Sequence, residues 1–194
     1  ERVANLFVTK ATYAVLITAM VGVLGSPFPF LPRQLTLIGT FSIGVPGFFL
    51  ALAPEVDLIR PGFLRRVLWF SVPAGVIAGS ATLAAYESAL HVADIDLDQA
   101  RTLATVTLLS IGLVVLAVAS RPLRSWKIGL VVAMGLGYVV TFLVPFLRDY
   151  FKLEVFWDTA WLYSVAAVAV AGPLIVALPL VIPTRTPAMS QPPG

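Results

Sequence analysis

Long apolar stretches constrain the fold of this chain more than any other feature of its sequence. Six of them, each close to the roughly 20 residues that one bilayer crossing requires, are separated by short polar or proline-rich connections. Only 12% of the 194 residues are charged, whereas soluble domains average about a quarter. The sequence therefore predicts an all-α membrane protein with six transmembrane helices.

The boundaries of these stretches predict one six-helix domain over residues 1–182. Its approximate spans are residues 3–24, 34–53, 67–88, 100–119, 126–147 and 159–182. Residues 183–194 are rich in proline and polar side chains, a composition typical of a disordered tail.

Basic residues are distributed unevenly between the two ends of the predicted spans. If the termini and the second and fourth connections share one side, that side holds Arg2, Arg60, Arg65, Arg66, Arg121, Arg124, Lys127 and Arg185. The other side holds Arg33, Arg101, Arg148 and Lys152. Because basic residues in short loops favour the cytoplasm, both termini are predicted to be cytoplasmic.

Several classes of site are excluded by composition. The chain has no cysteine and a single histidine, His91, so disulfides, thiolate metal sites and a Ser-His-Asp triad are not expected. The ten acidic residues fall in predicted connections or at helix ends. Nothing in the sequence indicates binding to nucleic acid, and the expected surroundings are the lipid bilayer of the cell membrane.

Lys10 is the one charged residue well inside a predicted span, with Thr9 and Tyr13 beside it. An ionisable group at mid-bilayer costs about 2.5–3.5 kcal/mol on insertion scales, which makes it a candidate for a functional role. The alternative is that its long side chain snorkels to the headgroups. The sequence leaves both interpretations open.

The second span contains a potential break. Gly44, Pro46 and Gly47 interrupt it after the hydroxyl residues Thr40 and Ser42. Proline removes a backbone donor, and carbonyls freed in a membrane need protein, water or an ion as a partner. We expect an unwound segment near mid-membrane that faces Lys10, Thr9 and Tyr13 of the first span. A simple proline kink, with hydroxyls bonded to their own helix, is the alternative.

The segment from residue 1 to residue 66 resembles the C-terminal half of P-type cation-transporting ATPases. Its motif residues lie at the end of the first span, in the turn that follows, in the second span and directly after it. They are Leu24, Gly25, Pro27, Pro32, Gln34, Ser42, Ile43, Gly44, Val45, Pro46 and Pro54. The resemblance implies that the six spans correspond to the fifth to tenth membrane helices of such a pump. It points to a calcium-linked actinobacterial branch.

The same resemblance shows departures at the ion site. Where the calcium-pump pattern has an aspartate and an asparagine in the second span, this chain has Ile43 and Gly39. Where the pattern has a glutamate and an asparagine in the first span, this chain has Ala14 and Ala11. Calcium prefers six to eight oxygen ligands. The candidates that remain for the ion path are hydroxyls and carbonyls around Thr9, Lys10, Tyr13, Thr40, Ser42, Gly44 and Pro46.

The resemblance also implies parts that this sequence does not contain. ATP and Mg²⁺ would bind to cytoplasmic domains upstream, together with further membrane helices of the same pump. The connection with Glu55, Asp57 and Arg60 would relay the state of the phosphorylation domain to the helices, or simply anchor the chain through its basic residues. A free-standing six-helix permease subunit or membrane scaffold without ATPase activity is the rival hypothesis.

Overall fold

The protein is a bundle of long helices. The computed structural model describes residues 2–52, 62–122 and 125–181. Over these ranges it contains helices and connections but no strand, and six helical segments are long and apolar enough to cross a membrane. The predicted all-α fold with six candidate transmembrane helices is confirmed, and the chain is a multi-pass membrane protein.

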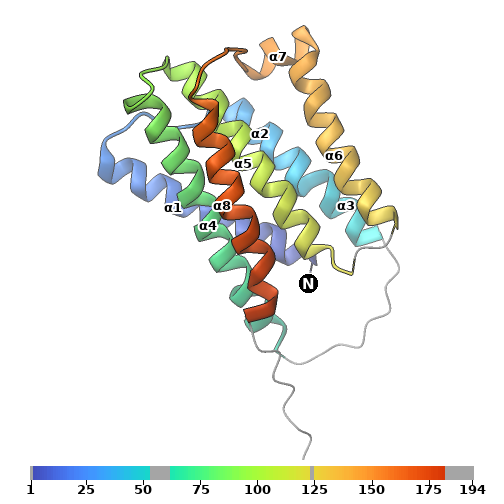
Figure 1. Ribbon diagram of the computed structural model, residues 1–194. Coiled ribbons are helices and arrows are strands. Elements are labelled where there is room, and N and C mark those ends of the chain that lie inside the picture. Colours follow the sequence, from blue (N-terminus) through green and yellow to red (C-terminus); the bar gives the residue numbers. More distant parts are fainter. Residues whose placement is uncertain (1, 53–61, 123–124, 182–194) are drawn as a thin grey trace, which may run out of the picture.

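Over the described residues, nine helical elements make up the six spans and one additional short helix; Figure 1 shows their arrangement. In chain order they are α1 (Arg2–Leu24), α2 (Pro32–Gly39), η1 (Thr40–Gly44), α3 (Val45–Leu52), α4 (Phe63–His91), α5 (Leu97–Ala119), α6 (Ser125–Leu143), α7 (Pro145–Phe151) and α8 (Trp161–Val181). The second span is the continuous run of α2, η1 and α3, whereas α7 is too short to be a span.

Helix α5 is the centre of the bundle. It packs against α1, α2, η1, α4, α6 and α8, and Figure 1 shows it between α8 and α6. In its most apolar stretch 61% of the residues are buried, against 22% in α6. Helix α1 lies along α4, and most contacts of the first span with the rest of the bundle are with α4.

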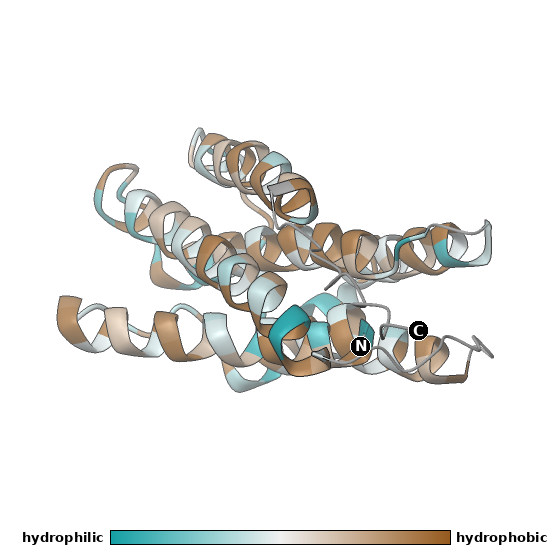
Figure 2. Cartoon of the chain, turned by 90° about the horizontal axis from the view of Figure 1, so that it is seen from below, coloured by the Kyte–Doolittle hydropathy of each residue, from teal (hydrophilic) through white to brown (hydrophobic). Residues whose placement is uncertain are grey.

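The outward faces of the helices are apolar. Exposed large side chains include Phe7 and Val15 of α1, Val132 of α6 and Val170 of α8. In Figure 2 the apolar colour runs along the helices, and the hydrophilic colour gathers at their ends and connections. This distribution suits a bundle whose outer surface faces lipid tails.

Proline ends the fifth span earlier than its hydropathy suggests. The predicted stretch of residues 126–147 is divided, because α6 stops at Leu143 and Val144 is extended before Pro145. The residue before a proline disfavours the helical conformation, and a proline fits the first turn of a new helix. The short helix α7 therefore begins at Pro145 instead of prolonging the span.

Hydrogen bonds join the connections at one end of the bundle, which we call the capped end (residues 25–31, 92–96 and 144–160). The Tyr86 hydroxyl donates to the Pro27 carbonyl at 2.8 Å, and Arg101 Nε donates to the Phe28 carbonyl at 3.2 Å. The backbone N–H of Glu154 donates to Thr102 Oγ1 at 2.9 Å. The turn after α1 is thus attached to both α4 and α5.

Gln34 has a special place in the capped end. Its side-chain oxygen accepts the Leu31 N–H at 2.9 Å, which caps the start of α2, and its side-chain nitrogen donates to the Lys152 carbonyl at 3.1 Å. The side chain is fully buried and both of its polar atoms have partners. One amide therefore fixes the second span to the segment that follows α7.

Candidate functional site

The break in the second span is a π-helical turn. Residues Thr40–Gly44 form η1, in which the Val45 N–H bonds to the Thr40 carbonyl five residues back. The expectation of an unwound segment around Gly44, Pro46 and Gly47 is wrong, because α3 continues the helix from Val45. A π-helical turn places one extra residue in the helix, and the chain passes Pro46 without opening into an extended segment.

A small cavity lies beside this π-helical turn. Its volume is about 20 Å³, and four segments line it: α1, η1, α4 and α5. The lining residues are Leu6, Thr9, Tyr13, Ser42, Ile43, Ala78, Leu108, Gly112 and Val115. A space of this size holds one water molecule or one dehydrated ion of similar size. Three of the predicted ion-path residues, Thr9, Tyr13 and Ser42, therefore meet at one cavity.

Thr9 is the most unusual member of the cavity wall. Its side chain is 3% exposed, and Oγ1 has no hydrogen-bond partner among the described residues. A buried hydroxyl without a partner costs about 1–3 kcal/mol. Eight Thr and Ser hydroxyls in the described helices donate to the carbonyl four residues back, as Thr12 does to Val8. The free hydroxyl of Thr9 thus stands out against its own helix.

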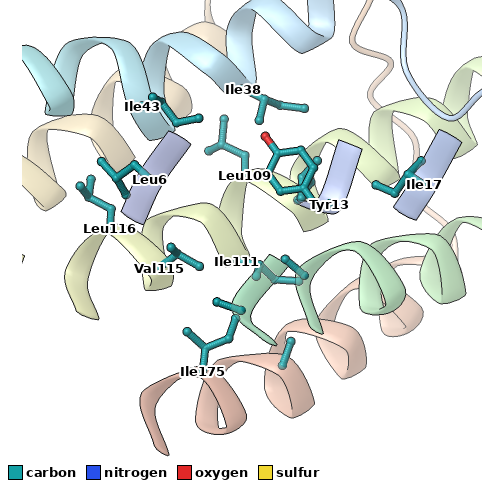
Figure 3. Packing of buried hydrophobic residues seen from close by; sticks show 14 of the residues in the cluster. Leu6, Tyr13, Ile17, Ile38, Ile43, Leu109, Ile111, Val115, Leu116 and Ile175 are labelled. Atoms are coloured by element: carbon teal, nitrogen blue, oxygen red, sulfur yellow. The ribbon is translucent and has the colours of Figure 1, made fainter. Parts of the chain in front are cut away.

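Ser42 and Tyr13 complete the polar part of the wall. Ser42 Oγ donates to the Ile38 carbonyl at 2.6 Å, which leaves its lone pairs free to accept or to coordinate. Tyr13 is 7% exposed, and Figure 3 shows its side chain between Ile38 of α2 and Ile111 of α5. The hydroxyl-bearing residues of two spans consequently face one another, as the sequence predicted.

Sequence reasoning missed the contributions of α4 and α5. A β-carbon at Gly112 would lie 3.1 Å from Ser42 Cβ, so this glycine lets α5 approach the π-helical turn closely. Gly75 does the same for α1, because a β-carbon there would lie 2.5 Å from Thr12 Cβ and 2.8 Å from the Thr9 carbonyl. Glycines inside otherwise apolar spans were the available signal.

Lys10 does not line the cavity but lies against the start of the π-helical turn. Its Nζ is 3.0 Å from the position that a β-carbon of Gly39 would occupy. The side chain is half-buried. It makes no ion pair with any residue in the described ranges. The ammonium therefore takes up the space that a side chain at position 39 would fill.

The remaining candidates lie elsewhere. Thr40 is exposed and donates to the Thr36 carbonyl at 2.8 Å, on the side of the helix away from the cavity. Gly44 is also exposed, whereas Pro46 is buried in the first turn of α3. The proposed relay residues Glu55, Asp57 and Arg60, and the tail 183–194, lie outside the described residues.

No carboxylate is among the described residues that line the cavity. Within residues 2–52, 62–122 and 125–181, no group of three or more His, Cys, Asp or Glu side chains could hold a metal ion. Any cation at the cavity would meet neutral oxygen atoms from this chain, with Lys10 one residue beyond Thr9. Such an arrangement can coordinate a partly dehydrated cation but cannot neutralise its charge.

Comparison with known proteins identifies relatives of this membrane segment. The chain is 42% identical to the calcium-transporting ATPase CtpE of Mycobacterium bovis and 38% identical to CtpE of Mycolicibacterium smegmatis. Each alignment covers 167 residues, 79% of this chain and 21% of the relative. The chain is homologous to part of a cation-transporting ATPase. No family model matches it.

A more distant relative extends this similarity. A probable cation-transporting ATPase of Streptococcus pneumoniae is 25% identical over 162 residues, 78% of this chain and 20% of that protein. The resemblance to P-type cation pumps inferred from residues 1–66 is confirmed, and it extends across most of the chain. The chain spans about one fifth of the length of these relatives. They do not favour the rival hypothesis of a free-standing permease subunit or scaffold.

Proposed function

We propose that this chain is part of the membrane domain of a P-type ATPase and forms part of the path along which a cation crosses the cell membrane. The observation that supports this most is the 42% identity to a calcium-transporting ATPase over 79% of the chain. ATP hydrolysis itself would take place on domains beyond these helices, where ATP and Mg²⁺ bind.

The cavity between α1, η1, α4 and α5 is the proposed ion-path element. Thr9 and Ser42 supply hydroxyl oxygens from two different spans, and Tyr13 supplies a third hydroxyl-bearing side chain. The Thr9 hydroxyl has no hydrogen-bond partner among the described residues. Coordination to a passing cation would give this buried oxygen a partner. Thr40 and Gly44, on the opposite face, would meet helices contributed by the rest of the pump.

Calcium is the proposed cargo, by analogy with the named relatives. It takes six to eight oxygen ligands, more than three hydroxyl-bearing side chains can give. The additional ligands would come from backbone carbonyls near the π-helical turn and from membrane helices outside this chain. Pro46, in the first turn of α3, contributes because it has no N–H, so that one carbonyl of the preceding turn loses its usual donor.

Lys10 would tune this site by its charge. Its ammonium lies against Gly39, at the entrance to the π-helical turn and next in sequence to Thr9. A fixed positive charge at this place would repel a bound cation and favour its release, or would stand in for a cation after release. Either role differs from simple snorkelling, in which the ammonium would only reach the headgroups.

The connection with Glu55, Asp57 and Arg60 is proposed as the relay between these helices and the phosphorylation domain. Its acidic residues would contact that domain, and its basic residues would anchor the connection at the cytoplasmic surface. Ala substitutions at Glu55 and Asp57 would then slow turnover without loss of membrane insertion.

The proposal is tested by ATP-driven ⁴⁵Ca²⁺ uptake into inverted membrane vesicles that contain the intact pump. The variants are Pro46→Ala and Lys10→Met, with Lys152→Met as a control that removes a lysine at the capped end. We expect uptake to fall strongly in Pro46→Ala and to change in Lys10→Met, and to remain near wild type in Lys152→Met.

Two results would contradict the proposal. Wild-type uptake in Pro46→Ala and Lys10→Met, at equal expression, would reduce the π-helical turn to a packing kink and Lys10 to an anchor. A reading frame that starts close to Glu1, without an upstream aspartyl-phosphate motif, would revive the scaffold hypothesis. ATP-dependent uptake of another cation but not of calcium would retain the pump and replace its cargo.

A further inference from the structure

A second hollow lies on another face of α5 from the ion-path cavity, and it extends toward the end of the bundle opposite the capped end. Its volume is about 260 Å³, and α5, α6 and α8 line it. The lining residues are Leu113, Val114, Ala117, Val118, Arg121, Val131 and Val176. All but Arg121 are aliphatic, so this groove is an apolar channel with one cationic end.

The groove follows the last turns of α5 toward the membrane surface. From Leu113 to Ala119, the last residue of α5, the rise is about 9 Å at 1.5 Å per residue, and Arg121 follows two residues later. Helix α5 ends at Ala119, and the exposed Trp126 stands at the start of α6. Tryptophan at a span end is typical of the headgroup level. Arg121 therefore lies near the headgroups, while the aliphatic wall extends into the hydrocarbon layer.

Water is a poor occupant of this groove. A water molecule in a protein needs two to four polar partners, and the aliphatic wall offers none. A hydrocarbon chain, in contrast, fills such a wall with dispersion contacts and leaves no polar group unsatisfied. The depth and the lining thus match the acyl chain of a membrane lipid.

Charge selects among the lipids. The exposed guanidinium of Arg121 can bind a phosphate oxygen pair in bidentate fashion. Trp126 follows closely in sequence at the same end of the bundle, whereas Lys127 is buried and donates to the Pro122 carbonyl at 3.4 Å, so Arg121 is the cation that faces the groove. Basic pockets between membrane helices are known to favour anionic headgroups. The headgroup of a zwitterionic lipid carries a positive charge, which Arg121 would repel, so such a lipid would bind less tightly.

We propose that the groove between α5, α6 and α8 is a binding site for an anionic phospholipid, with its acyl chain against Leu113, Ala117 and Val176 and its phosphate on Arg121. The site is separate from the ion path and does not depend on the proposed pump activity. Its occupant would hold α6 and α8 in place along α5.

The test is photo-crosslinking of the full chain in bilayers of phosphatidylglycerol and phosphatidylcholine. A trace of either lipid carries a diazirine in its acyl chain, and the labelled peptides are mapped by mass spectrometry. We expect the phosphatidylglycerol probe to label the α5 segment 113–118 and the facing parts of α6 and α8. The phosphatidylcholine probe should label them several-fold less.

Matched variants separate this site from general surface charge. Arg121→Gln should lower groove labelling by phosphatidylglycerol to the level of phosphatidylcholine. Arg65→Gln removes the same charge at the same end, where the guanidinium lies 5.9 Å from the Trp69 ring centre, and should change nothing. Ala117→Phe should block labelling by both probes, whereas Val170→Phe on the exposed face of α8 should not.

Three outcomes would overturn the proposal. Equal labelling by the two probes would remove the headgroup preference. Equal losses in Arg121→Gln and Arg65→Gln would reduce the effect to diffuse attraction. Labelling spread over all exposed faces, or no labelling of the groove, would mean that ordinary annular lipid or another protein segment covers it. Unchanged thermal unfolding of Arg121→Gln serves as the folding control.

Discussion

Gln34 at the capped end and Thr9 at the ion-path cavity are both buried, but they differ in whether their polar atoms have partners. At the capped end, Gln34 uses both of its side-chain polar atoms, and Tyr86 and Arg101 each reach a backbone carbonyl of the turn after α1. At the cavity, Thr9 is equally buried but its hydroxyl has no partner among the described residues.

This contrast distinguishes polar groups that stabilise the fold from a polar group that is left available to a ligand. Satisfied buried groups fix one arrangement of the chain, whereas an unsatisfied group stores a cost that a ligand can relieve. The capped end therefore holds the first, second and third spans in register. The cavity and the adjacent π-helical turn keep oxygen atoms available, and π-helical turns are often found at functional sites.

The two ends of the bundle should lie on opposite sides of the membrane, which is the largest expected difference. Cysteines placed at Asp96 of the capped end and at Ser125 at the start of α6 should react from opposite sides with an impermeant maleimide. The native chain has no cysteine, so the background is clean. Positive-inside bias predicts that Ser125→Cys reacts from the cytoplasm. Reaction of both from one side would overturn the topology.

Gly75→Ala should destabilise the region of the cavity strongly. The new β-carbon would lie 2.5 Å from Thr12 Cβ and 2.8 Å from the Thr9 carbonyl, so α1 must move away from α4. Overpacking of this kind costs about 1–3 kcal/mol or more. Gly22→Ala, where nothing lies within 4 Å, is the matched control and should be neutral or stabilising. Similar unfolding temperatures for both variants would contradict the close packing.

Gln34→Ala should weaken the capped end by about 1–3 kcal/mol, because it leaves the Leu31 N–H and the Lys152 carbonyl without their partner. Thermal unfolding in detergent measures the loss. Arg33→Ala, which removes one exposed bond to the Tyr150 carbonyl, should cost less. Equal losses of stability in the two variants would mean that Gln34 contributes no more to the capped end than an exposed hydrogen bond does.

Tyr86→Phe should have the smallest effect, about 1 kcal/mol, because it removes a single hydroxyl bond to the Pro27 carbonyl. Hydrogen–deuterium exchange of residues 25–31 should increase while exchange around the cavity stays unchanged. Equal increases in both regions would mean that the capped end and the cavity are not independent.

Hydropathy and charge patterns were sufficient to predict the six spans, because span length and apolar content are properties of each segment alone. The meeting of Thr9, Tyr13 and Ser42 was also predictable, since a short turn places the first two spans side by side. The motif residue Gln34 was visible in the sequence, but its role as a tie between α2 and Lys152 depends on the fold.

The local geometry of the second span was not predictable in the same way. Glycine and proline at residues 44–47 allow unwinding, a kink or a π-helical turn, and the choice depends on packing against α5 and α6. Gly112 and Gly75 have no polar atoms in their side chains, so only the structure reveals how closely they let Ser42 and Thr9 approach their neighbours.

The central claim is that the Thr9 hydroxyl is reserved for a cation, and Thr9→Val in the intact pump tests it most directly. Valine keeps the volume and removes an unsatisfied buried hydroxyl, so the variant should unfold at a higher temperature while calcium uptake falls by about tenfold or more. Thr12→Val, whose hydroxyl bonds only to the Val8 carbonyl, should keep wild-type uptake. Wild-type uptake in Thr9→Val, or equal losses in the two variants, would contradict the account.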